Sequence, residues 1–320
     1  MTNRSKKVYL CGYLFQDFAK AVFPDYISLK LTASTVANSN PSDLLLWSGS
    51  CQLVSQFKGT IVYLDGEAGK MPKIPSILRT RQTRVFYLGV REPPQKVDGH
   101  MELFHVAHTT LVRDYSANDL VMLHRQRGSS PVAPHFLLYV NSHCVQFREQ
   151  AFNELVAAAA LQQIELPIAK GRCHGMYPET RRFVNDRGER LKNADKLKGF
   201  RFVLAMENTF KDGYITEKIM DAFFAGAVPV YYGTYDVFSI FNRNAFIYYD
   251  IKNPVRAISK ILELEKNKSA YEDMLKQPIL AEHESSLETF FSLRDDIGSG
   301  SLRHKIRQLV GIDATREVGF

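Results

Sequence analysis

The chain has 320 residues, 45% of them hydrophobic, which is enough to bury the cores of two domains of about 150 residues each. It holds no run of the roughly 18 to 20 apolar residues that a membrane span needs, and its start lacks the apolar region of a signal peptide, so we expect a soluble, cytoplasmic protein. The formal charge of +7 indicates an anionic partner, and the lack of RNA-binding aromatic patterns and zinc-finger spacing disfavours nucleic acid.

The first part of the chain alternates short apolar, β-branched or aromatic runs with helical segments, which is typical of parallel α/β layers. The segment Arg125–Pro134 is rich in Gly, Ser and Pro and indicates a domain boundary. We therefore divide the chain into residues 1–130, residues 131–290 and a helical tail of residues 291–320. Strands are predicted for the first sheet at Lys7–Gly12, Asp43–Trp47, Thr60–Leu64, Arg84–Gly89 and Leu103–His108.

The second part shows the same alternation and predicts a second sheet. Helices are expected at Glu149–Ile164 and Pro254–Lys266. Two doubly wound sheets of this kind would bind a ligand at the carboxyl ends of their strands. The strands predicted here are His135–Asn141, Phe200–Met206, Val228–Tyr232 and Ala245–Tyr249.

The tail carries a short apolar face beside basic residues. We interpret it as a packing helix, with weak peripheral membrane contact as the alternative. The apolar face consists of Leu302, Ile306, Leu309 and Val310.

The cysteines are scattered along the chain and form neither a CxxC pair nor a Cys/His pattern that would hold a metal. A chain of this size does not need disulfides for stability, so we expect reduced thiols that pack as small hydrophobes. The four are Cys11, Cys51, Cys144 and Cys173.

The most informative stretch runs from Phe200 to Gly233 and predicts a strand, a loop, a helix and a further strand. Thr216 suits the N-cap of that helix and Gly226 its end. Lys218 would lie in the first turn, where a cation opposes the helix dipole at a cost of about a few tenths of a kcal/mol unless it faces an anion. This position indicates a diphosphate site, although a solvated lysine on the outer helix face is an equal alternative.

Three polar residues near this turn allow more than one interpretation. Glu217 suits the helix dipole at the first helical position, with or without a ligand. Glu207 and Asn208 end the preceding strand, where they would either reach into the crevice or cap the loop. From the residues alone, an anion or nucleotide site is as far as the prediction goes.

The run MENTFKDGYITEKIMDAFFAGAVPVYYG, residues 206–233, resembles the signature of the α1,3-fucosyltransferases of glycosyltransferase family 10. The resemblance can be followed from Ser42 to Leu280. It implies a GT-B fold of two facing Rossmann-like α/β domains, with GDP-fucose bound mainly by the second. It also implies inverting transfer of L-fucose to a glycan hydroxyl, such as O3 of GlcNAc, without a metal or another cofactor.

Site residues follow from the same resemblance. Asn208, Tyr214, Glu217 and Lys218 match positions that contact the nucleotide sugar: Lys218 would neutralise the diphosphate, and Glu217 would hold ribose hydroxyls or stabilise positive charge on the sugar ring. The upstream segment FLLYVNSHCVQFREQAF also resembles the family. Its Arg148 matches an arginine expected to grip the phosphates, the alternative being an exposed arginine in a first helical turn.

An inverting transfer needs a carboxylate that takes the proton of the acceptor hydroxyl. Glu67 in the segment LDGEAG matches the acid of a Gly-Glu pair in the family and is the preferred base. Glu92 in REPP is the rival, because some members carry the base in a Phe-Glu-Ser-Pro setting.

Two other interpretations stay open. The sequence Asp65-Gly66-Glu67 resembles a variant of the Asp-x-Asp motif, which would indicate a metal-dependent, single-domain GT-A transferase. The other interpretation is a non-catalytic module that binds nucleotides or glycans. No motif in the sequence predicts the identity of the acceptor sugar or the linkage that is formed.

Overall fold

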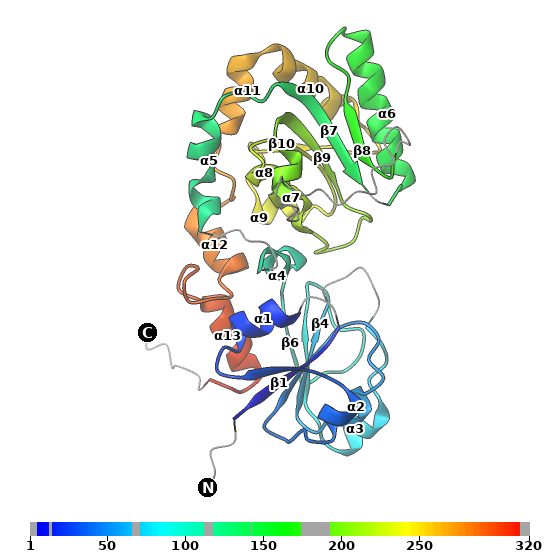
Figure 1. Cartoon of the computed structure of the whole chain (residues 1–320), viewed down its shortest axis with the longest axis vertical. Coiled ribbons are helices and arrows are strands. Elements are labelled where there is room, and N and C mark those ends of the chain that lie inside the picture. The colour runs from blue at the N-terminus through cyan, green and yellow to red at the C-terminus, as the bar shows by residue number, and fades with distance from the viewer. Residues whose placement is uncertain are drawn as a thin grey trace, which may run out of the picture. The chain divides into compact units, whose positions relative to one another are not determined.

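The computed structural model describes residues 5–12, 15–65, 71–111, 118–141, 143–173 and 193–313. The chain forms two compact units: unit 1 is Met1–Ala117 with Leu287–Phe320, and unit 2 is Asn118–Ser286 (Figure 1). The boundary therefore lies before the position expected from the sequence, because much of RQRGSSPVAP is helical and belongs to α5, Asp119–Ser129. The expected tail belongs to unit 1.

Within the described ranges, unit 1 holds a sheet of six parallel strands in the order β2-β1-β3-β4-β5-β6. The strands are β1 Lys7–Cys11, β2 Ile27–Lys30, β3 Leu44–Trp47, β4 Thr60–Leu64, β5 Val85–Leu88 and β6 Gly99–Met101. The helices are α1 Phe15–Val22, α2 Ala33–Val36, α3 Ser76–Thr80, α4 His105–Leu111, α12 His283–Phe291, which crosses the unit boundary, and α13 Ser301–Leu309, with a 3-10 turn at Val54–Gln56.

One strand prediction in unit 1 is wrong. Residues 105–108 of the predicted strand Leu103–His108 are helical and open α4, while β6 takes the sheet edge just before them. Leu103, Phe104 and Val106 are all buried. A short, continuously buried apolar run looks the same in a strand and in a buried helix, so its periodicity could not separate the two.

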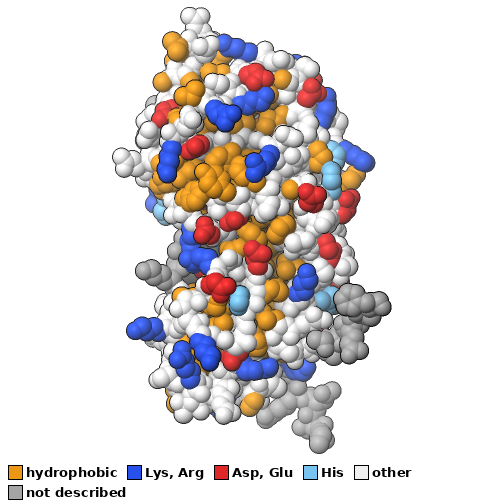
Figure 2. All heavy atoms as spheres, turned by 180° about the vertical axis from the view of Figure 1, so that it is seen from behind, with side chains coloured by type: hydrophobic (Ala, Val, Ile, Leu, Met, Phe, Trp, Pro, Cys, Tyr) orange, Lys and Arg blue, Asp and Glu red, His pale blue; other side chains and the backbone are white. Residues whose placement is uncertain are grey.

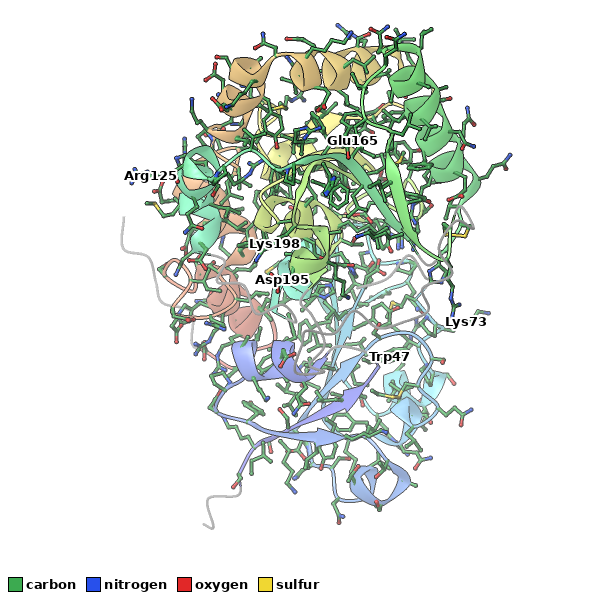
Figure 3. All side chains as sticks on the ribbon, turned by 45° about the horizontal axis from the view of Figure 1, so that its top comes forward. Trp47, Lys73, Arg125, Glu165, Asp195 and Lys198 are labelled. Atoms are coloured by element: carbon green, nitrogen blue, oxygen red, sulfur yellow. A yellow bond between two sulfur atoms is a disulfide. The ribbon has the colours of Figure 1, made fainter. Side chains whose placement is uncertain are left out.

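The core of unit 1 lies on both faces of its sheet. Helices α1 and α13 pack on one face and α2 and α3 on the other (Figure 1). Burial on both faces explains why β3 and β4 read as continuous apolar runs. Trp47, labelled in Figure 3, ends β3 and is buried in this core.

The expected apolar face of the tail is also part of this core. Leu302, Ile306 and Val310 are buried there, so α13 is a packing helix and the alternative of membrane contact through this face is wrong. In the described part of the chain, no helix combines the length and the apolar character required to cross a lipid bilayer.

Unit 2 holds, in its described residues, a sheet of five parallel strands in the order β11-β10-β9-β7-β8. The predicted bounds of β7, β9 and β10 are confirmed, whereas β8 was not predicted. The strands are β7 His135–Asn141, β8 Ile168–Gly171, β9 Phe200–Met206, β10 Val228–Tyr232 and β11 Ile247–Tyr248. Besides α5, the helices are α6 Gln146–Leu161, α7 Asn193–Leu197, α8 Glu217–Phe224, α9 Val237–Ile240, α10 Val255–Lys266 and α11 Lys268–Leu275.

The two sheets share one topology. In each, the second strand along the chain lies outside the first, and the third strand lies on the first strand's other side. The order of the strands therefore reverses between β1 and β3 in unit 1 and between β7 and β9 in unit 2. In open parallel sheets, ligands bind at the carboxyl ends of the strands at this point.

The expectation of reduced cysteines is wrong, because all four form disulfides: Cys11 with Cys51, and Cys144 with Cys173. Cys11 ends β1 and Cys51 follows β3, its neighbour in the sheet; Cys144 follows β7 and Cys173 follows the neighbouring β8. Parallel pairing brings together cysteines that are 40 and 29 residues apart in the sequence. Their spacing could not reveal this pairing.

Candidate active site

Glu207 is the centre of a polar cluster where β9 ends and α8 begins. Its side chain is fully buried, with an exposed fraction of 0%. Its Oε1 accepts hydrogen bonds from the backbone N of Thr216 at 2.6 Å and from the Thr216 hydroxyl at 3.0 Å. Thr216 is the N-cap, as predicted, but its own side chain makes no capping bond. Glu207 thus satisfies the backbone N–H of the N-cap residue itself, just before α8 begins.

Lys218 points into this cluster. Its Nζ donates to Glu207 Oε2 at 3.0 Å and to Thr216 Oγ1 at 2.7 Å, and 24% of the side chain is exposed. Burial alone would lower the pKa of Lys218, but the charges of Glu207 and Glu217 outweigh it and raise the pKa above 10.5. The alternative of a solvated lysine is wrong. The charged ammonium keeps a third N–H that has no partner among the described residues.

Arg148 lies in the first turn of α6 with an exposed fraction of 1%, so the alternative of an exposed arginine is wrong. Its Nε donates to the carbonyl of Glu207 at 3.2 Å and its Nη1 to Asn141 Oδ1 at 2.8 Å, while Nη2 donates to Asn208 Oδ1. Burial lowers the pKa of Arg148, against the effect of nearby Tyr139 and Glu207. The guanidinium holds together the carboxyl ends of β7 and β9, and its contact with phosphates stays a prediction.

The other donor residues predicted from the sequence lie at the same edge of the sheet. Asn208 follows Glu207, Tyr214 is buried in the loop before α8, and Glu217 is the first residue of α8 and partly exposed. The charges of Tyr214 and Glu217 both act on Lys218. The structure therefore assembles all five predicted donor residues around the topological reversal between β7 and β9.

Gly233, at the end of β10, is a site residue that the sequence alone did not single out. A Cβ at this position would lie 2.9 Å from Glu207 Cγ and 2.3 Å from the hydroxyl oxygen of Tyr231. Only glycine lets the chain pass so close to the buried carboxylate. The carboxylate of Asp236 accepts from the backbone N of Gly213 at 2.7 Å and so holds the loop before α8.

Two exposed aromatic side chains lie after the carboxyl ends of β9 and β10. Phe210 lies in the loop after β9 and Tyr235 in the turn after β10, and their ring centroids are 5.4 Å apart. Exposed ring faces after the carboxyl ends of two neighbouring strands suit stacking on a planar or sugar ring. Alternation of apolar residues did not predict this pair, because each is a lone aromatic residue in a turn.

In unit 1, the preferred base Glu67 lies outside the described residues. Its neighbour Asp65 ends β4 and accepts hydrogen bonds from the Tyr87 hydroxyl and from Arg91, each at 2.7 Å. The side chain of the rival Glu92 is 88% exposed, and its Oε1 lies 3.8 Å from His100 Nε2. Of the two glutamates, the described part of the structure thus places Glu92 on the surface.

Potential metal ligands gather in one place among the described residues: Cys144, Glu149 and Cys173. Both sulfurs are joined in a disulfide, which removes them as thiolate ligands. Figure 2 shows Lys and Arg side chains scattered over one face and interspersed with Asp and Glu, so that face has no continuous basic stripe among the residues described.

Comparison with solved structures defines the fold class. The chain resembles an α1,3-fucosyltransferase solved with GDP-fucose, with a TM-score of 0.58 and 18% identity over 98% of this chain and 94% of the other. It also resembles an α,α-trehalose-phosphate synthase from Burkholderia vietnamiensis, with a TM-score of 0.53 and 10% identity over 95% and 100%. The predicted GT-B class, with Rossmann-like α/β domains, is confirmed. The single-domain GT-A alternative is wrong.

A family model narrows this class. Residues 134–277 match the model described as glycosyltransferase family 10 (fucosyltransferase) C-term. The match lies within unit 2 and contains all five predicted donor residues. Over residues 134–277, the chain is therefore similar to the C-terminal domain of this fucosyltransferase family.

Curated relatives agree over shorter stretches. The chain is 42% identical over 93 residues to the α-(1,3)-fucosyltransferase FucT of Helicobacter pylori, covering 28% of this chain and 20% of the relative. It is 32% identical over 88 residues to the GDP-fucose protein O-fucosyltransferase 3 of Bos taurus, covering 27% and 18%. Each match spans a fifth or less of the relative's length.

Proposed function

We propose that this protein is an inverting, metal-independent α1,3-fucosyltransferase that moves L-fucose from GDP-fucose to a glycan hydroxyl, such as O3 of GlcNAc. One observation carries the proposal. Lys218 keeps an N–H without a partner among the described residues, at the N-terminus of α8 and inside the segment that matches the family model. A charged donor at a helix N-terminus is suited to a diphosphate.

The donor end of the reaction follows from this placement. The diphosphate of GDP-fucose binds at the start of α8, where Lys218 and the helix N-terminus offset its charge and the charge that grows on departing GDP. Glu217, at the first position of α8, holds ribose hydroxyls or stabilises positive charge on the fucose ring. Arg148 keeps Asn208 in place through the hydrogen bond to its side-chain oxygen.

The acceptor end requires a base. Glu67 takes the proton from the acceptor hydroxyl as that oxygen attacks the anomeric carbon of fucose from the face opposite GDP. The carbon–oxygen bond to the acceptor forms while the bond to the diphosphate breaks, so the configuration inverts. Support for Glu67 comes from its position two residues after Asp65, just past the carboxyl end of β4.

The proposal needs no metal and no further cofactor. In metal-dependent transferases a divalent cation offsets the charge of the diphosphate. Here the ammonium of Lys218 and the N-terminus of α8 take that role, with the guanidinium of Arg148 next to them.

The disulfides bear on the cellular compartment, which the sequence predicted to be the cytoplasm. Stable disulfides are typical of oxidising compartments and rare in the cytosol. All four cysteines are paired. We therefore propose an oxidising compartment in place of the cytoplasm.

A panel of GDP- and UDP-sugars in EDTA, assayed by thermal unfolding, tests the donor. GDP and GDP-fucose should protect the protein, and a ligand at 100 times its Kd adds about 2.7 kcal/mol. Release of GDP from GDP-fucose should then accelerate with N-acetyllactosamine. Protection by UDP-sugars alone, or binding of GDP only after Mn²⁺ is added, contradicts the proposal. Binding of GDP-fucose without transfer to any saccharide indicates a binding module.

Substitution of Lys218 sharpens this test. Lys218→Ala should weaken GDP binding by about 1.5 to 3 kcal/mol, the usual value of a hydrogen bond to a charged group, and leave guanosine binding nearly unchanged. Lys268→Ala is the matched control, because Lys268 is an exposed lysine of the same unit. Equal losses for guanosine and GDP would mean that Lys218 supports the fold and not the diphosphate.

A further inference from the structure

A second polar cluster lies at the carboxyl ends of β4 and β5 in unit 1, apart from the donor residues of unit 2. Asp65 follows β4 directly, and its side chain has an exposed fraction of 7%. Its Oδ2 accepts one hydrogen bond from the Tyr87 hydroxyl and one from Arg91 Nη2, each at 2.7 Å. A nearly buried carboxylate with two donors on one oxygen is held in a fixed orientation.

The surroundings of the cluster leave Asp65 little freedom to move. A Cβ at Gly89 would lie 2.9 Å from the Cβ of Asp65 and 2.9 Å from Cε1 of Tyr87, so only glycine fits between them. Tyr87 stacks on Tyr63 with 5.8 Å between ring centroids, and Tyr63 packs edge to face on Trp47 at 5.1 Å. Burial, together with the hydrogen bond to Asp65, raises the pKa of Tyr87, so its hydroxyl stays a donor.

The cluster leaves hydrogen-bonding capacity unused. Asp65 Oδ1 has no hydrogen-bond partner among the described residues, while Oδ2 has two. Arg91 uses one of its five N–H groups there, and 38% of its side chain is exposed. A carboxylate oxygen and a guanidinium therefore lie next to each other at this edge of the sheet, both with free positions.

The charges of the cluster cancel. Asp65 contributes one negative charge and Arg91 one positive charge. The nearby His108 is buried against His105, with 4.6 Å between ring centroids. Burial first, and His105 second, hold the pKa of His108 well below 6.5, so this imidazole is neutral at pH 7.

Resting on the function proposed above, we propose that Asp65 and Arg91 bind the acceptor, and that the acceptor sugar they hold is a neutral one with two adjacent hydroxyls. Asp65 Oδ1 accepts from one hydroxyl, and the free N–H groups of Arg91 donate to the oxygen of the next. Tyr87 is a positioning residue that fixes Asp65. A sulfate or carboxylate in place of the hydroxyl that faces Asp65 Oδ1 would have no proton to donate and would meet a like charge at hydrogen-bond distance, which disfavours it.

Kinetics with the full chain, GDP-fucose and N-acetyllactosamine test the binding step. Arg91→Ala should raise KM for the acceptor by about 10- to 100-fold, the loss expected for a hydrogen bond to a charged group. Arg91→Lys keeps the charge but loses the fork of donors, so KM should rise by a similar factor. GDP affinity and the slow hydrolysis of GDP-fucose without acceptor should stay within twofold for both variants.

The matched control is Asp98→Asn. Asp98 is an exposed aspartate that accepts from the backbone N of Val85, at the opposite end of β5. It should leave acceptor KM unchanged. Tyr87→Phe removes one donor to Asp65 and should raise acceptor KM less than Arg91→Ala does, with kcat nearly unchanged. Trp47 fluorescence reports whether each variant keeps unit 1 folded.

Selectivity tests the charge argument. Monosulfated forms of N-acetyllactosamine, each with the sulfate on a different hydroxyl, are compared with the neutral sugar. Asp65→Asn removes the negative charge and leaves Arg91, so the ratio of sulfated to neutral kcat/KM should rise at least about tenfold for one of these forms. An unchanged ratio for every form overturns the assignment of Asp65.

The two proposals fail in different ways. If the wild-type protein binds no GDP-fucose, or transfers fucose to no saccharide, the fucosyltransferase proposal fails. If the wild-type protein transfers fucose while folded Arg91→Ala keeps acceptor KM within twofold of it, that proposal stands and the acceptor role of Arg91 is wrong.

Discussion

The two units have the same sheet topology, yet different groups occupy the point where the strand order reverses. In unit 2, between β7 and β9, Arg148 joins the strand ends beside the buried Glu207 and Lys218. In unit 1, between β1 and β3, the disulfide of Cys11 and Cys51 takes the corresponding position. The polar groups of unit 1 lie further along the sheet, where β4 and β5 end.

This difference shows that topology restricts where a site can form but does not decide its chemistry. Among the described residues, a disulfide without charge occupies the reversal point of unit 1, whereas Arg148 and Lys218 lie at that of unit 2. The family match is consistent with a donor site in unit 2, because residues 134–277 lie within unit 2 alone. Donor binding by unit 2 and acceptor binding by unit 1 is the division of labour that the following predictions test.

The largest expected effect concerns the base in unit 1. Glu67→Gln keeps the size of the side chain but cannot accept a proton, so transfer should fall by roughly 10² to 10⁴. GDP affinity, measured by calorimetry, should stay nearly unchanged, since the donor residues lie in unit 2. The rate should rise as this carboxylate ionises, and the variant should lose that limb of the pH profile.

Glu92→Gln is the matched control for that experiment. The exposed Glu92 side chain is 3.8 Å from His100, so this variant should keep near-normal transfer. The opposite result, with Glu67→Gln active and Glu92→Gln inactive, would place the base after β5 and mean that Glu92, not Glu67, matches the acid of the family. A loss of GDP affinity in Glu67→Gln would break the proposed division between the units.

The part of this comparison that the sequence could predict depends on local signals. β7, β9 and β10 are continuous apolar runs because both faces of the sheet are covered, and their bounds were predicted as observed. Lys218 was identified because a cation opposes the helix dipole, a conflict that can be read from one turn of sequence.

The rest depends on contacts between segments that are distant in sequence. Glu207 gains its role only when Thr216 and Lys218 fold over it, and Gly233 is needed only because the next strand lies against that carboxylate. The disulfides need the order of the strands, which no spacing of cysteines contains. β8 was missed because its four residues, Ile168–Gly171, include a lysine and two partly exposed positions besides it.

The disulfides give a second test that separates stability from function. Cys11→Ser/Cys51→Ser and Cys144→Ser/Cys173→Ser open loops of 40 and 29 residues, so loop entropy predicts nearly equal destabilisation of about 4 kcal/mol. Only the second pair lies beside the loop that leads into α6 and Arg148. Urea denaturation followed by circular dichroism should show similar losses, whereas calorimetry should show weaker GDP binding for the second pair alone.

Other outcomes for GDP binding by these two double variants would contradict the assignment of donor binding to unit 2. Equal weakening of GDP binding by both pairs would mean that the reversal point of unit 1 also contributes to donor binding. Loss of GDP binding by the first pair alone would reverse the division of labour. The two double variants are compared at temperatures where Trp47 fluorescence and circular dichroism show that both of these proteins are folded.

The smallest expected effect is a pH-dependent change in the stability of unit 1. The Glu288 carboxylate in α12 accepts from the backbone N of Ser299 at 2.7 Å, from its hydroxyl at 2.6 Å and from the backbone N of Ser301 at 3.1 Å. Burial alone would raise the pKa of Glu288, but these hydrogen bonds outweigh it and lower the pKa from 4.5 to about 2.

Because the pKa of Glu288 is lower in the folded state, its stabilisation is fully present above pH 4.5 and is lost as the pH falls towards 2. Glu288→Gln should therefore destabilise unit 1 by about 1 kcal/mol at pH 7, after allowance for its partial exposure, and by almost nothing near pH 2. Trp47, the single tryptophan of the chain, lies in the core of unit 1, so its fluorescence follows that unit during unfolding. GDP affinity should not change. A constant difference between the two proteins from pH 7 to pH 2 would mean that Glu288 stabilises unit 1 by packing, because only its charged form accepts all three hydrogen bonds.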